Sequence, residues 1–373
     1  MAVRPNESEQ GFIYDWNTYQ QTVQSRYNLN LELDDETLRD GLQSPSIKDP
    51  SIEEKIKILH LMEKLGIQAA DIGLPASGPR AKADITRIAK EIADNKMKLR
   101  PNCAVRTLVQ DMIPLVEISE AVGYPIEAAA FIGSSPIRIY AEEWTLSKMQ
   151  KLTEESVSFA VKHGIPVMYV TEDTTRAHPR TIKRLYSTAV NAGAERICVC
   201  DTVGHSTPIG VFYLLRFIQK MLHDMKVDVK VDWHGHSDRG CAIPNTMSAV
   251  STGVDRVHAT ALGIGERVGN TPMDLLLINL KLEGIIKQDL RKLTEYCQTV
   301  AQAVGYDIPV NYPVIGKDAF RTATGVHAAA IIKAERKGDA WLADRVYSGV
   351  PAEMVGQQQK IEVGFMSGLS NIV

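Results

Sequence analysis

Two histidines that lie two residues apart offer the clearest chemistry in this sequence. His234 and His236 fall in the segment 231–236, whose apolar start predicts a β-strand. Because side chains alternate between the two faces of a strand, both imidazoles point to the same side and can hold one metal ion. A buried pair that only satisfies backbone carbonyls is the alternative, but burying two imidazoles without a ligand is costly, so a metal role is favoured.

A carboxylate and a guanidinium stand side by side far upstream. Arg39 and Asp40 follow a short apolar segment at 31–34. Taken alone, Asp40 is more often a turn or capping residue, and Arg39 a surface charge. At the end of a strand, Asp40 becomes a third metal ligand and Arg39 a cation that receives negative charge building on a carbonyl oxygen. The two segments together predict a metal-assisted reaction on a small oxyanionic substrate.

A glycine-rich loop at 263–270 supplies a possible fourth ligand. Its glycines let the backbone approach a ligand closely, and the amide oxygen of Asn270 can complete a metal shell. By itself the loop is a weak signal, because many turns have similar sequences.

The composition is that of a globular enzyme with a large core. The chain has 373 residues, 44% of them hydrophobic, and a formal net charge of -3, so no strongly basic surface indicates nucleic acid. No apolar run approaches the roughly 18 residues that cross a bilayer, and the N-terminus does not resemble a secretion signal. Five cysteines indicate reduced thiols and a cytoplasmic protein. For Cys198 and Cys200, core packing is the preferred interpretation.

A repeating strand-then-helix pattern predicts the fold. The expected strands lie at 31–34, 69–72, 99–104, 126–132, 166–170, 196–200, 227–233 and 255–259. Most follow a helix that ends at a glycine, as at Gly66 and Gly123. Eight such units over roughly 250 residues favour a (β/α)8 TIM barrel over an open doubly wound sheet.

The barrel also predicts where the chemistry lies. Its active site is built at the C-terminal ends of the strands, where the residues singled out above converge with Asp71, Glu172 and Thr202. We expect an N-terminal extension over 1–30, the barrel over 31–284 and a small C-terminal helical subdomain over 285–373.

Four separated motifs carry a family resemblance. The segments 37–41, 201–204, 234–238 and 263–267 resemble the DRE-TIM metallolyases, specifically the isopropylmalate, homocitrate and citramalate synthases, and the resemblance covers residues 31–355. It implies that a divalent metal, Mn2+, Mg2+ or Zn2+, is held by Asp40, His234 and His236. Asn270 matches the asparagine after the glycine-rich loop, and Arg39 the catalytic arginine.

The resemblance also implies a reaction. In these synthases acetyl-CoA condenses with an α-keto acid in a Claisen reaction, and hydrolysis of the thioester then releases CoA. Thr202 matches the threonine that binds the keto-acid carboxylate, and Glu172 a glutamate near the reacting centre. His327 and Tyr347 resemble an acid–base pair that reaches the neighbouring subunit's active site, which implies a homodimer.

Departures from the pattern bear on the direction of the reaction. Leu42 after Arg-Asp-Gly is typical of the hydroxymethylglutaryl-CoA lyases, but their catalytic cysteine loop is missing here, so condensation is favoured over cleavage. The full-length leucine-regulated synthases carry a further effector domain, which we do not expect in this chain. A barrel that kept its scaffold but lost turnover is the alternative from a different class.

Other departures bear on the substrate. Ala130 and Val170 stand where the synthases often present polar pocket residues, and 321–323 also departs from the usual pattern. An apolar pocket suits 2-oxoisovalerate, the substrate of 2-isopropylmalate synthase in leucine biosynthesis, because burying an unpaired second carboxylate costs several kcal/mol. Arg138 or Arg106 can still meet a distal carboxylate, so homocitrate, citramalate or Re-citrate synthesis stays open.

Overall fold

The computed structural model describes residues 12–13, 30–323 and 325–362. In it, eight parallel strands close into a barrel in sequence order, which confirms the predicted TIM barrel. The strands are β1 (Glu32–Asp35), β2 (Ala69–Asp71), β3 (Arg100–Arg106), β4 (Glu127–Gly133), β5 (Val167–Glu172), β6 (Arg196–Asp201), β7 (Lys230–Gly235) and β8 (Arg256–Ala259). Their ends differ from the expected ones by at most three residues.

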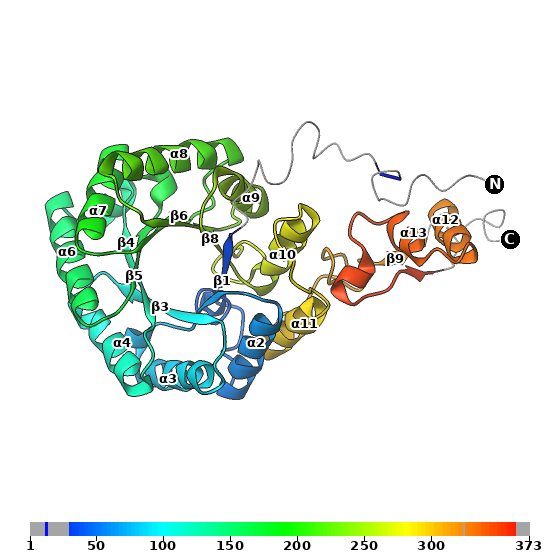
Figure 1. Cartoon of the computed structure of the whole chain (residues 1–373), viewed down its shortest axis with the longest axis horizontal. Helices are drawn as coiled ribbons and strands as arrows, with labels where there is room; N and C mark the ends of the chain where they lie inside the picture. The colour runs from blue at the N-terminus through cyan, green and yellow to red at the C-terminus, as the bar shows by residue number, and fades with distance from the viewer. Residues whose placement is uncertain (1–11, 14–29, 324, 363–373) are drawn as a thin grey trace.

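Helices follow the strands and surround the barrel (Figure 1). They are α2 (Ile52–Lys64), α3 (Pro79–Asp94), α4 (Val109–Val122), α5 (Pro136–Ala141), α6 (Leu146–Lys162), α7 (Pro179–Asn191), α8 (Pro208–Met225), α9 (Ala242–Thr252) and α10 (Met273–Leu282). Ser51 caps the N-terminus of α2 and forms a capping box with Glu54. None of the helices in the described ranges is long and apolar enough to cross a membrane.

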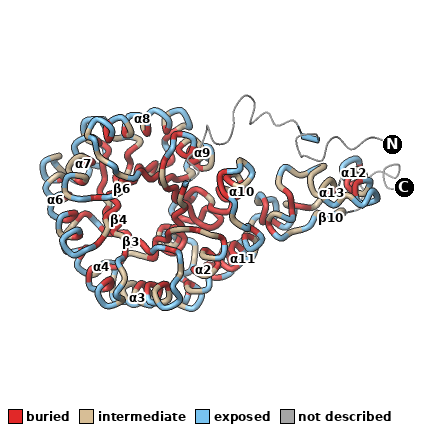
Figure 2. The backbone as a smooth tube through the Cα atoms, viewed as in Figure 1, coloured by how far each residue is buried: buried red, intermediate tan, exposed pale blue. Residues whose placement is uncertain are grey.

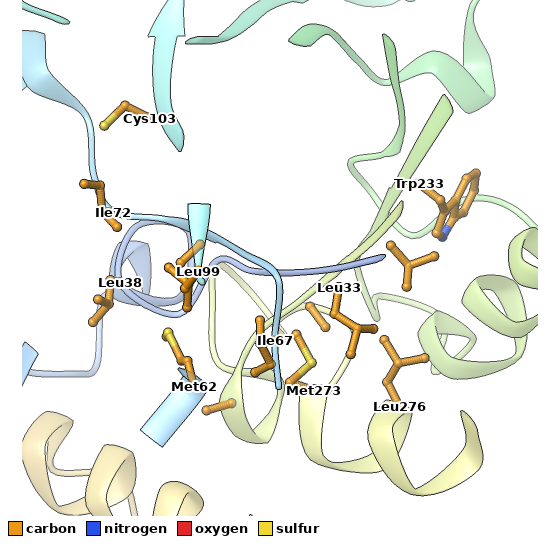
Figure 3. Packing of buried hydrophobic residues seen from close by; sticks show 14 of the residues in the cluster. Leu33, Leu38, Met62, Ile67, Ile72, Leu99, Cys103, Trp233, Met273 and Leu276 are labelled. Carbon is orange, nitrogen blue, oxygen red and sulfur yellow. The ribbon is translucent and has the colours of Figure 1, made fainter. Parts of the chain in front are cut away.

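The main hydrophobic core lies between the strands and the helices, and buried backbone follows the strands in Figure 2. Figure 3 shows Leu33 of β1 in this layer with Met273 and Leu276 of α10; all three are fully buried. Because side chains alternate along each strand, the residues next to Leu33 face the barrel interior instead. The outward faces therefore supply the apolar packing, and the inward faces are free to carry polar groups.

A network of ion pairs fills the barrel interior near the N-terminal ends of the strands, which we call the floor of the barrel. The opposite end, where the strands end, is its mouth. We call Glu32, Glu127, Arg196, Asp232 and Arg256 the floor cluster. The Asp232 carboxylate accepts from Arg196 at 2.5 Å and from Arg256 at 2.6 Å. The Arg256 guanidinium also donates to Glu127 at 2.7 Å, and that of Arg196 to Glu32 at 3.1 Å. Each charge in the floor cluster thus has an opposite partner, which offsets much of the cost of burial.

The C-terminal region begins on the barrel and then leaves it. Helix α11 (Leu293–Val304) contacts α2 and starts four residues later than expected from the stretch 289–304. Beyond it lie β9 (Arg321–Thr322), α12 (Gly325–Arg336), α13 (Ala340–Arg345) and β10 (Lys360–Ile361), which project away from the barrel (Figure 1). The expected divisions at residues 30 and 284 stay predictions, and residues 1–11 and 14–29 of the expected extension lie outside the described ranges.

Candidate active site

A cavity of about 270 Å³ opens at the C-terminal ends of the strands. Most of the expected site residues meet there, because each follows a strand of the closed barrel. Those lining the cavity are Arg39, Asp40, Glu172, Thr202, His234 and His236. Asn270 joins them through a backbone bridge to His236.

We call Asp40, His234, His236 and Asn270 the mouth cluster. Asp40 and the two histidines each offer a ligand atom within 4.8 Å of the others. Three buried atoms of the cluster lack any hydrogen-bond partner: Oδ2 of Asp40, Nδ1 of His236 and Oδ1 of Asn270. Buried polar atoms almost always have partners, and these are carboxylate, imidazole and amide atoms that bind divalent cations. The residues therefore fit a metal ion.

A second group of possible ligands lies beside the first. Glu36, His234 and His258 also bring ligand atoms within 4.8 Å. Here the atoms are already engaged, since Glu36 accepts from Nδ1 of His234 at 2.7 Å and from Nδ1 of His258 at 3.0 Å. The mouth cluster is therefore the better metal site. With Nδ1 of His234 bonded to Glu36, its Nε2 is the nitrogen left for an ion.

The protonation states of Asp40 and His236 suit a metal. Burial acts to raise the pKa of Asp40, but the Arg39 guanidinium outweighs it and the pKa is lowered. Burial and the neighbouring His234 lower the pKa of His236 to about 4. For His234, burial acts to lower the pKa, yet the Glu36 carboxylate raises it. At neutral pH, Asp40 is thus ionised and His236 neutral, the forms in which these groups bind metals.

The Arg39 guanidinium is fixed by three carboxylates. It donates to Asp71 at 2.6 Å, to Asp40 at 2.5 Å and to Glu36 at 3.2 Å. A guanidinium has five N–H donors, so two remain for a substrate oxygen in the cavity that Arg39 lines. Burial raises the pKa of Asp71 to about 7 even though Arg39 acts to lower it.

The glycine-rich loop holds Asn270 in place. Gly269 has φ +89°, and a Cβ there would lie 1.8 Å from the carbonyl oxygen of Gly263. At Gly265 a Cβ would lie 2.3 Å from the Asn270 amide nitrogen. That nitrogen donates to the Ile264 carbonyl at 3.1 Å. The unpaired Oδ1 of Asn270 therefore lies on the opposite side of the amide group. The glycines are therefore needed for close packing of the loop around Asn270.

An apolar surface lines another part of the cavity. We call Ala129, Phe131, Met168, Val170 and Cys198 the apolar wall; all of them line the cavity. Ala130 of β4 was expected in the pocket. Its side chain lies instead in the core between the strands and the helices, so the expectation was wrong by one position. Leu42 lines a neighbouring cavity and not this one.

Two polar residues at the strand ends complete the cavity. The Thr202 hydroxyl accepts from the Asp173 backbone at 2.9 Å. Glu172 lies 3.8 Å from Arg138, and burial raises its pKa more than Arg138 lowers it. Arg106 makes two hydrogen bonds to Asp111, at 2.6 and 2.9 Å. Among the described residues, neither Arg138 nor Arg106 lines the cavity.

The structure brings His327 and Tyr347 together, but not to the mouth of their own barrel. Their ring centroids are 4.0 Å apart, with His327 on α12 and Tyr347 after α13. No described residue beyond Glu266 lines the cavity. Thr324, which belongs to the same motif, lies outside the described residues.

Two residues of the site escaped the sequence analysis. Glu36 and His258 line the cavity and bond to each other, although Glu36 directly follows β1 and His258 lies in β8, far apart in the chain. The available signal was positional. Glu36 lies two residues after Asp34 and His258 two after Arg256, so each continues an inward-facing row once the barrel is assumed.

Comparison with known proteins agrees with this geometry. The HMGL-like family profile matches residues 30–300. The homocitrate synthase AksA of Methanopyrus kandleri is 30% identical, over 91% of this chain and 80% of that protein. The 2-isopropylmalate synthase of Pyrococcus furiosus is 29% identical, over 81% of this chain and 60% of that protein. This chain thus spans less than two thirds of the Pyrococcus synthase.

Solved structures support the fold. The HMG-CoA lyase of Brucella melitensis superposes with a TM-score of 0.61 at 18% identity, over 73% of this chain and 98% of that chain. At this identity the likeness concerns the barrel and not the reaction. From the family match and the sequence relatives together, the chain belongs to the HMGL-like (DRE-TIM) family, with relatives among the 2-isopropylmalate and homocitrate synthases.

Proposed function

We propose that this chain is an enzyme that condenses acetyl-CoA with an aliphatic α-keto acid and then hydrolyses the thioester. The preferred acid is 2-oxoisovalerate, which makes the enzyme a cytoplasmic 2-isopropylmalate synthase of leucine biosynthesis. One observation carries the proposal: Asp40 and His236, each with a buried unpaired atom, line the same cavity as His234 and the apolar wall. The names of the relatives agree with this class of reaction.

The mouth cluster is the proposed cofactor site. Asp40, His234 and His236 would hold Mn2+, Mg2+ or Zn2+, and Asn270 would add its amide oxygen. When bound, such an ion acts as a Lewis acid on the oxygens of the keto acid.

Residues around the cluster position the keto acid. Arg39 has two unused N–H donors and is held rigidly by three carboxylates, so it can stabilise negative charge on the keto oxygen without reorganising. The Thr202 hydroxyl can donate to the substrate carboxylate while still accepting from the Asp173 backbone. Glu172 lines the cavity beside them, where its carboxylate can orient the reacting groups.

The apolar wall selects the side chain of the keto acid. A branched alkyl group gains roughly 0.8 kcal/mol for each buried methylene, whereas an unpaired second carboxylate loses several kcal/mol. The arginines that could meet that carboxylate are engaged elsewhere: Arg106 bonds to Asp111, and Arg138 to Glu142 at 3.1 Å. These contacts favour 2-oxoisovalerate over 2-oxoglutarate.

The proposed reaction has two steps, a condensation and a hydrolysis. A base removes a proton from the acetyl methyl group, the resulting carbanion bonds to the keto carbon, and the keto oxygen takes up a proton. Water then attacks the thioester, the C–S bond breaks and CoA leaves as a thiol. We assign the acid–base roles to His327 and Tyr347, whose rings contact each other but do not line the cavity of their own chain. They would therefore act in a homodimer, at the partner subunit's site.

The first experiment measures release of free CoA thiol from acetyl-CoA in the presence of Mn2+ or Mg2+. Four acids are compared: 2-oxoisovalerate, 2-oxoglutarate, pyruvate and oxaloacetate. We expect turnover with 2-oxoisovalerate that is lost in His234→Ala. Preference for another acid would overturn the assigned substrate while keeping the reaction.

Silence with all four acids would overturn the condensation. Cleavage of a 3-hydroxyacyl-CoA would then identify a lyase, and a chain that binds no Mn2+ would identify a non-catalytic barrel. Mixing His327→Ala and His234→Ala subunits tests the homodimer: activity above that of either variant alone is expected if the two residues act across subunits.

A further inference from the structure

Glu36 is a buried carboxylate at the mouth of the barrel with three charged or titratable partners. It accepts from His234 at 2.7 Å, from His258 at 3.0 Å and from Arg39 at 3.2 Å. These partners come from β7, β8 and the loop after β1, and Glu36 itself is only 4% exposed. One buried side chain thus links a proposed metal ligand to the arginine of the proposed reaction.

His258 holds Glu36 in this position. Its Nδ1 faces Glu36 and its Nε2 faces the Asp232 carboxylate, each at 3.0 Å. Asp232 is in turn fixed by Arg196 and Arg256 of the floor cluster. Because an ionised carboxylate only accepts hydrogen bonds, both imidazole nitrogens of His258 act as donors. His258 is therefore anchored at both ends and has no nitrogen left for a metal ion.

The Glu36 contact decides which nitrogen His234 offers. With Nδ1 of His234 donating to Glu36, Nε2 is the nitrogen left for an ion held with Asp40 and His236. If Glu36 rotated away, His234 could exchange its tautomer or turn its ring, and the ligand atoms would no longer converge. The placement of Glu36 is therefore a condition for the mouth cluster.

We propose that His258 is a positioning residue for the metal site: by anchoring Glu36 to the floor cluster, it fixes the nitrogen that His234 presents to the ion. The proposal rests on the metal site of the proposed function, but it adds a residue that is not itself a ligand of the ion. It explains why the mouth of the barrel is connected to a charged network on its floor.

Two substitutions of His258 separate positioning from simple packing. In His258→Asn the side-chain amide lies near the former Nδ1 and can still donate to Glu36. In His258→Gln it lies near the former Nε2, so it can reach Asp232 and loses Glu36. Both variants keep a polar side chain of similar size, which limits the difference in packing.

The experiment titrates Co2+ into the metal-free full chain and follows calorimetry and the visible absorption of the bound ion. We expect His258→Gln to weaken Co2+ binding about tenfold or more and to change the spectrum, within the roughly 10–100-fold range known for such supporting contacts. His258→Asn should keep most of the affinity and the wild-type spectrum. Glu36→Gln should resemble His258→Gln.

Asn102→Ser serves as a control, because Asn102 donates to Asp34 at 2.8 Å inside the same barrel but does not contact Glu36. It should lower the melting temperature and leave Co2+ affinity unchanged. Equal Co2+ affinities in His258→Gln and His258→Asn would overturn the positioning role alone. A wild-type chain that binds no Co2+ would overturn the metal site and this proposal together.

Discussion

The mouth and the floor of the barrel are both rich in buried charge, but they differ in how that charge is paired. On the floor, Asp232 and Arg256 each meet oppositely charged groups at hydrogen-bond distance. At the mouth, Asp40, His236 and Asn270 each keep a buried atom with no partner. Buried charge alone therefore does not mark a functional site. Several unpaired ligand atoms gathered at one cavity are a better mark, because single unpaired buried atoms, such as Oδ1 of Asn102, also occur elsewhere in the barrel.

The largest expected effect comes from removing a ligand at the mouth. Asp40→Asn keeps an oxygen that can accept from Arg39 but loses the charge that attracts a cation. We expect kcat/KM for CoA release to fall by about 10³-fold or more, since metal activation contributes several kcal/mol to such reactions. In the presence of EDTA, the free energy of unfolding should fall only a little, because Arg39 keeps Asp71 and Glu36 as partners and the second oxygen of Asp40 has no partner to lose.

Activity and stability are therefore measured on the same preparation of Asp40→Asn. A large loss of stability without metal would contradict the view that the mouth is built for a ligand. Retained activity would remove Asp40 from the metal site.

The floor should show the opposite behaviour. Arg256→Met leaves Asp232 and Glu127 without one of their buried cations. Breaking a buried ion pair from one side costs about 3–5 kcal/mol, so we expect a loss of that size in urea unfolding. Arg87→Met is the matched control, because its pair with Glu91 is exposed and should contribute less than about 1 kcal/mol. Similar losses in the two variants would show that the buried pairs of the floor contribute no more to stability than an exposed pair.

These two regions were not equally visible in the sequence. The barrel could be predicted because the repeating strands, capped helices and terminal glycines are local signals. The mouth cluster followed, since His234, His236 and Asp40 stand at strand ends, which a closed barrel brings together. The bond between Glu36 and His258 depends on the pairing of β1 with β8, which exists only after closure.

The sequence predicted an apolar pocket, but it assigned one residue to the wrong face of β4. A shift of one residue along a strand reverses the face on which a side chain lies, so Ala130 was placed in the pocket while its neighbours Ala129 and Phe131 line it. The distance of His327 and Tyr347 from their own cavity could not be predicted from motif order, because it depends on how the C-terminal region leaves the barrel.

A smaller effect is expected from the apolar wall. Ala129→Val adds two methyl groups to a cavity of about 270 Å³, so 2-oxoisovalerate should lose about 10–100-fold in kcat/KM relative to the smaller pyruvate. Ala130→Val adds the same groups to the neighbouring outward-facing position. It should leave the ratio between the two acids unchanged, and a changed ratio there would contradict the assigned faces of β4.

The smallest effect concerns pH and one acid at the mouth. Burial raises the pKa of Asp71 from an ordinary value near 3.8 to about 7. Between about pH 4 and 7, the folded chain therefore holds a proton that the unfolded chain has lost. Stability consequently falls as pH rises through this window, by at most about 1.4 kcal/mol per pH unit for this group.

Asp71→Asn should remove this contribution, since asparagine can accept from Arg39 without titrating. The measurement is urea unfolding between pH 5 and 8 with EDTA, taken as the difference between wild type and variant. Asp274→Asn is the comparison, because burial raises the pKa of Asp274 only to about 6 and its effect should end there. If the difference in unfolding free energy between wild type and Asp71→Asn does not change between pH 6 and 7, the pKa of Asp71 is not raised. Its partners would then offset the cost of burying its charge, as they do for the charges of the floor cluster.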